Sequence, residues 1–103
     1  MQFHDSYRVG ASQNLAYAVA GGASAASTAF GSQTYWIRVS TAGLLDATNN
    51  GARISFGPSP VATASSVLLP LNWVQVFKIT PGSKVAALGN SASTGSLSIT
   101  ELE

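Results

Sequence analysis

Few residues in this chain are able to carry out acid–base or nucleophilic chemistry. The one histidine, His4, stands beside Asp5 near the N-terminus, and the chain contains no cysteine. A serine triad needs an imidazole held by a carboxylate, and a zinc site needs several imidazoles or thiolates. Because His4 lies in a terminal segment that is expected to be flexible, we predict that it is not catalytic.

The carboxylates are equally scarce and lie far apart, at positions Asp5, Asp46, Glu101 and Glu103. A glycosidase needs two carboxyl groups facing one bond, which these positions supply only if the fold joins distant segments. Residues 46–51 resemble the start of a calcium loop, but Gly57 stands where the bidentate glutamate belongs, so a polar turn explains them better. No phosphate loop, dinucleotide fingerprint or nucleophile elbow occurs. We predict a protein that is not an enzyme and holds no cofactor or metal.

Two tryptophans offer a different chemistry, because an exposed indole face provides apolar contact to a sugar ring. Trp36 and Trp73 both stand in segments where they alternate with aliphatic residues, which favours the core or a subunit interface over sugar contact. Two arginines, Arg38 and Arg53, are expected either to reach a partner's carboxylate or to lie as solvated charges that discourage strand pairing at a sheet edge.

The elements that position these residues are predicted to be strands. Side chains alternate at period two in residues 15–20, 35–39, 73–79 and 97–100, and residues 52–57 place Ile54 and Phe56 on one face. No long helix is expected, because the only helix-tolerant stretch, residues 15–30, is broken by two glycines. Residues 61–70 are expected to form one or two short extended pieces that end at Pro70.

Turn residues predict how these strands are connected. Asn50-Gly51 favours a hairpin that joins a strand at 34–41 to a strand at 52–57. Pro81-Gly82 fits the central positions of a type II turn, after which residues 84–89 are expected to pair with 73–79. Residues 18–33 are rich in Ala, Gly and Ser. We interpret them as a mobile loop, with close backbone approach between subunits as the alternative.

The strand count and the turns predict an all-β fold. We expect one domain over residues 1–103, an antiparallel β-sandwich of about seven or eight short strands, with a flexible N-terminal arm at residues 1–7. Its topology is expected to be jelly-roll-like or immunoglobulin-like, and the sequence leaves that choice open.

The surface of this domain is poor in charge. Five basic and four acidic residues make up 9% of the chain and give a net charge of +1, against about 25% charged residues in ordinary domains. A folded chain of this mass exposes roughly 5,400 Å², or about one charge per 600 Å². Such a surface predicts burial in an assembly and argues against nucleic-acid binding. No segment reaches the roughly twenty apolar residues of a membrane span, and no signal peptide is recognisable, so we expect a protein made in the cytoplasm.

From residue 34 onward, about two-thirds of the chain resembles small structural proteins of tailed bacteriophages. The resemblance rests on hydrophobic positions and turns, in residues 37–39, 54–57, 61–70, 76–86 and 95–101. It implies a virion protein, and proteins of this kind include capsid decoration (cement) proteins, commonly trimers at three-fold positions, as well as head-to-tail and tail components. The resemblance transfers no catalytic residue.

We therefore predict a capsid decoration protein, made in the host cytoplasm and located on the virion surface. It is expected to form a homo-oligomer, with a trimer favoured, and to bind the major capsid protein, without contacting nucleic acid or membrane. The expected interface is marked by large apolar side chains in places where a monomer would leave them exposed: Met1, Phe3, Tyr7, Trp36, Leu44 and Leu45. The alternatives are a neck or tail component and a carbohydrate-binding module.

Overall fold

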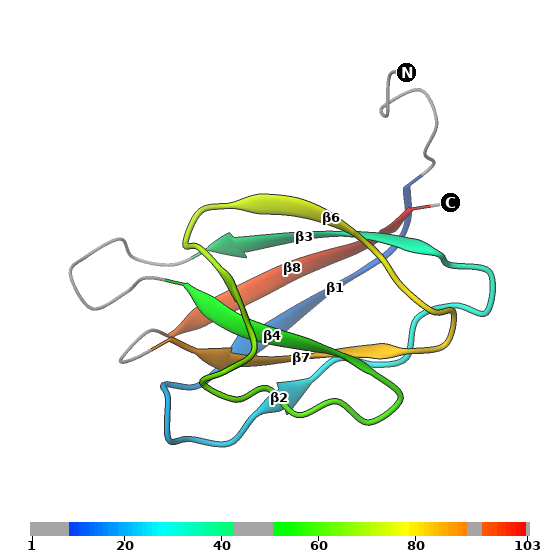
Figure 1. Cartoon of the computed structure of the whole chain (residues 1–103). Helices are drawn as coiled ribbons and strands as arrows, with labels where there is room; N and C mark the ends of the chain where they lie inside the picture. Colours follow the sequence, from blue (N-terminus) through cyan, green and yellow to red (C-terminus); the bar gives the residue numbers. More distant parts are fainter. Residues whose placement is uncertain (1–8, 43–50, 91–93, 103) are drawn as a thin grey trace.

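The computed structural model describes residues 9–42, 51–90 and 94–102, which form eight strands and no helix (Figure 1). The strands are β1 (Val9–Tyr17), β2 (Ala25–Ala26), β3 (Trp36–Ala42), β4 (Ala52–Gly57), β5 (Val67–Leu69), β6 (Val74–Lys78), β7 (Lys84–Gly89) and β8 (Gly95–Leu102). The all-β prediction is confirmed. Among these residues there is accordingly no helix long and apolar enough to cross a membrane.

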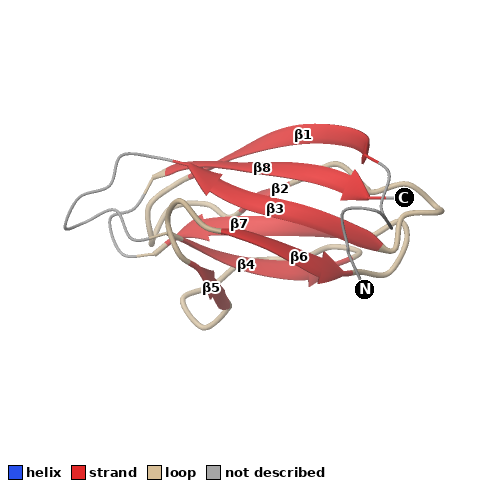
Figure 2. Ribbon diagram, turned by 90° about the horizontal axis from the view of Figure 1, so that it is seen from above, coloured by secondary structure: helices blue, strands red, loops and turns tan. Residues whose placement is uncertain are grey.

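Two four-stranded antiparallel sheets form the two layers of a sandwich (Figure 2). The first sheet has the order β1-β8-β3-β6 and the second has the order β2-β7-β4-β5. The strand pairs β1/β8, β2/β7, β3/β6 and β4/β5 are nested, as in one long hairpin that bends at the β4–β5 link and rolls up into two layers. This arrangement is the jelly roll, so the strand order selects between the two topologies that the sequence left open.

The predicted hairpin between residues 34–41 and 52–57 is wrong, because β3 lies in the first sheet and β4 in the second. Gly51 does adopt a positive φ of 112°, but it serves a close approach of backbones and not a hairpin turn. A Cβ at Gly51 would lie 2.3 Å from the Leu69 carbonyl oxygen. The Gly51 carbonyl in turn accepts a 3.0 Å hydrogen bond from the Asn90 N–H.

The turn at Pro81-Gly82 is present, whereas the strand pairing predicted to follow it is not. Gly82 has a φ of 80°, and the Ser83 N–H donates a 3.1 Å hydrogen bond to the Thr80 carbonyl, as in a type II turn. However, β6 belongs to the first sheet and β7 to the second. The turn therefore carries the chain across the sandwich, because a turn signal specifies a local reversal and not the partner of each strand.

The main core lies between the inner faces of the two sheets. Ile37, Val39, Leu97 and Ile99 of the first sheet are at most 1% exposed and belong to one cluster with residues of the second sheet, among them Ile54 and Val85. Phe56 and Phe77 pack against this cluster from opposite sheets, with ring centroids 5.1 Å apart. The period-two alternation is thus confirmed as an inward–outward alternation in β3, β4 and β8, whereas in β6 only Phe77 is partly buried.

Residues 18–33 differ from the mobile loop that their composition predicts. The segment contains β2, in which Ala25 pairs with Ala87 of β7. Beyond β2, the Ser27 and Phe30 N–H groups donate 2.8 Å hydrogen bonds to the carbonyls of Val85 and Ser83. Phe30 is 3% exposed. The small residues of this segment do allow close approach of two backbones. The approach is to β7 of the same chain, whereas the alternative interpretation placed it between subunits.

Candidate functional site

Of the six residues that the sequence marks as an interface, only one lies in the described part of the chain. Trp36 is half-buried at the start of β3. The others lie outside the described residues: Met1, Phe3, Tyr7, Leu44 and Leu45. A site supported by geometry must therefore be sought on the two sheets.

The outer face of the second sheet is covered by the chain itself. Ala62, in the connection between β4 and β5, forms a small buried cluster with Ala86 and Leu88, which point outward from β7. The Ala62 N–H donates a 2.9 Å hydrogen bond to the Ser24 hydroxyl, which fixes this connection to the segment before β2. The outer side of β7 thus has apolar cover, whereas Val67 and Leu68 of β5, at the edge of the second sheet, are 61% and 38% exposed.

Arg53 holds the same cover in place. Its Nη1 donates to the Ser66 carbonyl at 3.1 Å, and its Nε donates to the Asn90 Oδ1 at 3.2 Å. The guanidinium is only partly exposed and is engaged within the molecule. Of the two roles expected for Arg53, neither fits: it is a structural residue of the second sheet.

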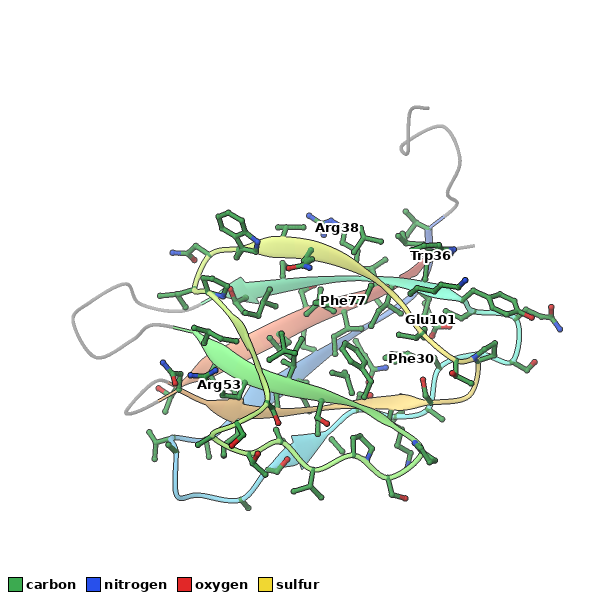
Figure 3. The ribbon with its side chains drawn as sticks, viewed as in Figure 1. Phe30, Trp36, Arg38, Arg53, Phe77 and Glu101 are labelled. Carbon is green, nitrogen blue, oxygen red and sulfur yellow. The ribbon has the colours of Figure 1, made fainter. Side chains whose placement is uncertain are left out.

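The outer face of the first sheet contrasts with this arrangement, because its side chains on β6, with Arg38 of β3, are exposed, although Leu102 at one end of β8 is buried. We call it the open face. In rows across the strands, the register places Leu102, Trp36 and Lys78 side by side, then Ser12, Thr100, Arg38 and Val76, then Asn14, Ser98, Ser40 and Val74. Figure 3 shows Arg38 and Trp36 on this outer side, while Phe30 and Phe77 point into the sandwich.

The open face combines three kinds of side chain. Small hydroxyl groups fill its middle, where the Ser12 and Thr100 hydroxyl oxygens lie 3.3 Å apart. Along β6 it is apolar, with Val74 and Val76 48% and 42% exposed. Two cations stand among them, and the Nζ of Lys78 lies 5.9 Å from the centroid of the Trp36 ring, within the range of a cation–π interaction. The second cation, Arg38, is exposed.

No carboxylate belongs to the described part of this face. The one carboxylate in the described residues, Glu101, lies on the inner side of β8, opposite Ile37. Its Oε1 accepts a 2.9 Å hydrogen bond from the Gly31 N–H and another from the Thr34 hydroxyl. Glu101 therefore fixes the connection between β2 and β3, and within residues 9–42, 51–90 and 94–102 no carboxylate faces the cations of the open face.

Neither tryptophan lies in the core. Of the two favoured places, the core and a subunit interface, the core is therefore wrong. Trp73 is 54% exposed just before β6. Its carbonyl accepts a 3.0 Å hydrogen bond from the Thr41 N–H, and its N–H donates a 3.1 Å hydrogen bond to the Thr41 hydroxyl. Thr41 is five residues along β3 from Trp36, a separation of about 17 Å. The two indoles therefore do not form one stacking platform for a single sugar ring.

A pocket of about 390 Å³ opens at one end of the sandwich, between the end of β4 and the β6–β7 turn. Its lining includes Phe56, Pro58, Lys78, Pro81 and Ser83. None of its lining residues is a histidine or a carboxylate, so the pocket supplies no pair of groups for acid–base chemistry. Nor does the described part of the chain bring three or more His, Cys, Asp or Glu side chains together around a metal position.

Sequence reasoning missed Val74, Val76 and Lys78 as the exposed strip of the open face. Residues 73–79 carry apolar side chains on both faces of the strand, a pattern that by itself predicts burial of both faces. In the structure β6 lies at the edge of the first sheet, and Val74 and Val76 on its outer face are exposed. The chain gave no match in comparisons with models of protein families, with curated proteins or with solved structures.

Proposed function

We propose that this chain is a bacteriophage virion protein that decorates the capsid and stabilises the assembled shell. The observation that carries the proposal is the difference between the two sheets. The second sheet has apolar cover over β7, whereas the first leaves Val74 and Val76 exposed beside Ser40 and Arg38. Exposed apolar strips of this kind are typical of surfaces that another protein covers.

The fold is compatible with this role. Jelly rolls occur in viral capsid proteins, but also in lectins and cupins. Fold alone does not define function, so the argument depends on the open face and on the low charge of the chain, 9% of its residues. The earlier resemblance to phage virion proteins points in the same direction.

The proposed mechanism is adhesive. A protein that binds the finished shell, and not free capsid subunits, stabilises the assembled state by mass action. At a free concentration one hundred times the Kd, each occupied site contributes about 2.7 kcal/mol. The proposed partner is the major capsid protein, and the proposed form on the shell is a homo-oligomer, with a trimer favoured, since three-fold lattice positions call for three copies.

The experiment that tests this function measures occupancy on heads purified from the phage that carries the gene. Val76→Glu places a charge on the open face, and Val61→Glu is the matched control, because Val61 is 66% exposed outside the strands of both sheets. We expect V76E to lower occupancy about ten-fold or more, as expected when a charge is buried at an interface, and V61E to bind like the wild type. Equal binding of both variants would refute the open face as the contact, and absence of wild-type binding would refute decoration.

Two other functions can be tested with the same purified virions and protein. A neck or tail component predicts few copies per virion, where decoration predicts hundreds, so quantification of the protein in purified virions separates them. A carbohydrate-binding module is favoured by one observation, the 54% exposure of Trp73. A glycan array with Trp73→Ala and Trp36→Ala as controls tests it, and binding that depends on either indole would replace the decoration hypothesis.

A further inference from the structure

The free edge of β6 carries backbone groups that point away from the sheet. The Ile79 N–H donates to the Tyr35 carbonyl at 2.8 Å, and the Thr41 N–H donates to the Trp73 carbonyl at 3.0 Å. Because hydrogen-bonded pairs alternate along an antiparallel ladder, the odd-numbered residues 73–79 bond to β3. The N–H and C=O groups of Val74, Val76 and Lys78 therefore face the edge, where the described part of the chain places no further strand.

The other edges in the described residues are shorter or protected. At the β1 edge the register shifts between Val9 and Ser12, and the Gln13 side chain accepts two 3.1 Å hydrogen bonds from Thr28. At the edges of the second sheet, β2 has two residues and β5 has three, followed by Pro70. Proline, bulges and short length are the devices by which proteins protect sheet edges.

By comparison, β6 is a regular strand with little protection. Its five residues, VQVFK, pair with β3 without a register shift, and they include no proline. Lys78 is the only charged residue in the strand. An edge of this kind is a template for one more strand. Main-chain hydrogen bonds to the added strand supply the affinity, and every second side chain along the strand determines which partner binds.

We propose that β6 binds an extended segment of another protein as an added antiparallel strand, with a carboxylate facing Lys78 and apolar side chains facing Val74 and Val76. The charges on the open face favour this occupant. Lys78 on β6 and Arg38 on the neighbouring β3 both lie on this face, and the carboxylate of Glu101 is on the inner side of β8 and already engaged. Opposite charges that face each other across a strand pair stabilise it, and like charges destabilise it.

A second copy of β6 fits less well, because it would bring another Lys78 and Arg38 and no carboxylate from the described residues. The segment is therefore assigned to a different protein. On the proposed function, from which this partner follows, the segment belongs to the shell. Strand addition at β6 itself depends only on the edge geometry.

The test uses the full chain and a capped synthetic peptide, Thr-Glu-Thr-Val-Thr-Val-Thr, which places Glu opposite Lys78 and the two valines opposite Val76 and Val74. We expect saturating peptide to slow hydrogen exchange of the Val74, Val76 and Lys78 amides about ten-fold or more, the protection that backbone hydrogen bonding confers. The Gln75 and Phe77 amides, already bonded to β3, should change little. Peptide binding without protection of the edge amides would overturn the proposal.

Two control peptides isolate the backbone and the charge. N-methylation of the Glu and both valines removes the donors that face β6, and this peptide should not bind. Replacing Glu by Lys should weaken binding about five-fold or more, since a favourable cross-strand pair becomes a repulsive one. Equal binding of the N-methylated peptide would overturn strand addition. Protection of the same amides that rises with protein concentration in the absence of peptide would identify a second copy as the occupant and overturn the assignment to a different protein.

Variants of the protein complete the test. Val76→Pro removes one edge donor without removing a bond to β3, a position where proline is tolerated, and Val76→Thr is the matched control that keeps the N–H. V76P should lose the peptide and V76T should keep it. If V76P does not fold, Lys78→Glu replaces it, and this variant should prefer the Lys peptide to the Glu peptide. Unchanged peptide preference would overturn the charge assignment.

The two proposals fail in different ways. If wild type and V76P occupy phage heads equally, strand addition at β6 is refuted and decoration stands. If the peptide protects the edge amides but the wild-type protein ignores the heads, decoration is refuted and the β6 site stands.

Discussion

At the scale of single residues, Tyr17 is the least satisfied polar group of the core. Its side chain is 4% exposed and belongs to the main cluster, yet its hydroxyl has no hydrogen-bond partner in the described part of the chain. A buried polar group without a partner costs about 1–3 kcal/mol. Tyr17 therefore contributes through its ring, while its hydroxyl opposes folding.

The Tyr17→Phe variant should accordingly be more stable than the wild type. Removing the hydroxyl removes its desolvation cost and keeps the ring, so we expect the free energy of unfolding to rise by about 1 kcal/mol. Urea denaturation at neutral pH measures this difference. A loss of stability of similar size would show that the hydroxyl makes a hydrogen bond in solution and would contradict this description of the core.

The same residue predicts a loss of stability in alkali. Burial raises the pKa of the Tyr17 phenol above its ordinary value of 10.0. Between pH 10 and the raised pKa, the unfolded chain loses this proton while the folded protein keeps it, so rising pH favours unfolding. The stability of the wild type should fall more steeply above pH 10 than that of Y17F. Parallel curves for the two proteins would show that Tyr17 titrates normally when folded.

Glu101 is predicted to be structural. Glu101→Ala leaves the Gly31 N–H and the Thr34 hydroxyl without their acceptor, and Thr34 is 2% exposed. We expect a loss of about 2 kcal/mol, within the range for orphaned buried groups. Glu101→Gln keeps an oxygen acceptor and should lose less than half as much. Chemical denaturation of both variants decides, and an E101A variant as stable as the wild type would contradict the role.

At the scale of elements, Gly51 determines how the start of β4 meets the β5–β6 connection. In Gly51→Ala the new Cβ would lie 2.3 Å from the Leu69 carbonyl oxygen, so backbone has to move. Gly82→Ala is the matched control, since Gly82 also has a positive φ, 80°, but open space around it. We expect G82A to cost about 1–2 kcal/mol from backbone strain alone, and G51A to cost clearly more. Equal thermal midpoints for the two variants would contradict the close approach.

The strands themselves could be predicted from the sequence, but their pairing could not. Alternation identified β3, β6 and β8, while β1 begins and ends earlier than residues 15–20 indicate. The pairing is dominated by distant partners, such as Val9 with Leu102, and a turn such as Pro81-Gly82 carries no information about them. For the same reason the open face was missed, because the sequence does not reveal that β6 is an edge.

At the scale of the whole molecule, the two sheets differ in what covers them. The β4–β5 connection covers part of the outer face of the second sheet, through Ala62 and Arg53, and leaves Val67 and Leu68 of β5 exposed. The first presents an apolar strip, a row of hydroxyl groups and two cations to the outside. On the proposed function, this sparsely charged domain is one component of an assembly, and we predict that the open face is turned toward its neighbour.

The most direct test of this account is a reconstruction of the virion by electron cryomicroscopy, at a resolution that separates the two sheets. We predict density for the jelly roll on the outside of the shell, in many copies, with the first sheet facing the capsid and β6 beside a capsid segment. A shell without this density, or a jelly roll that touches the shell through the second sheet, would contradict it.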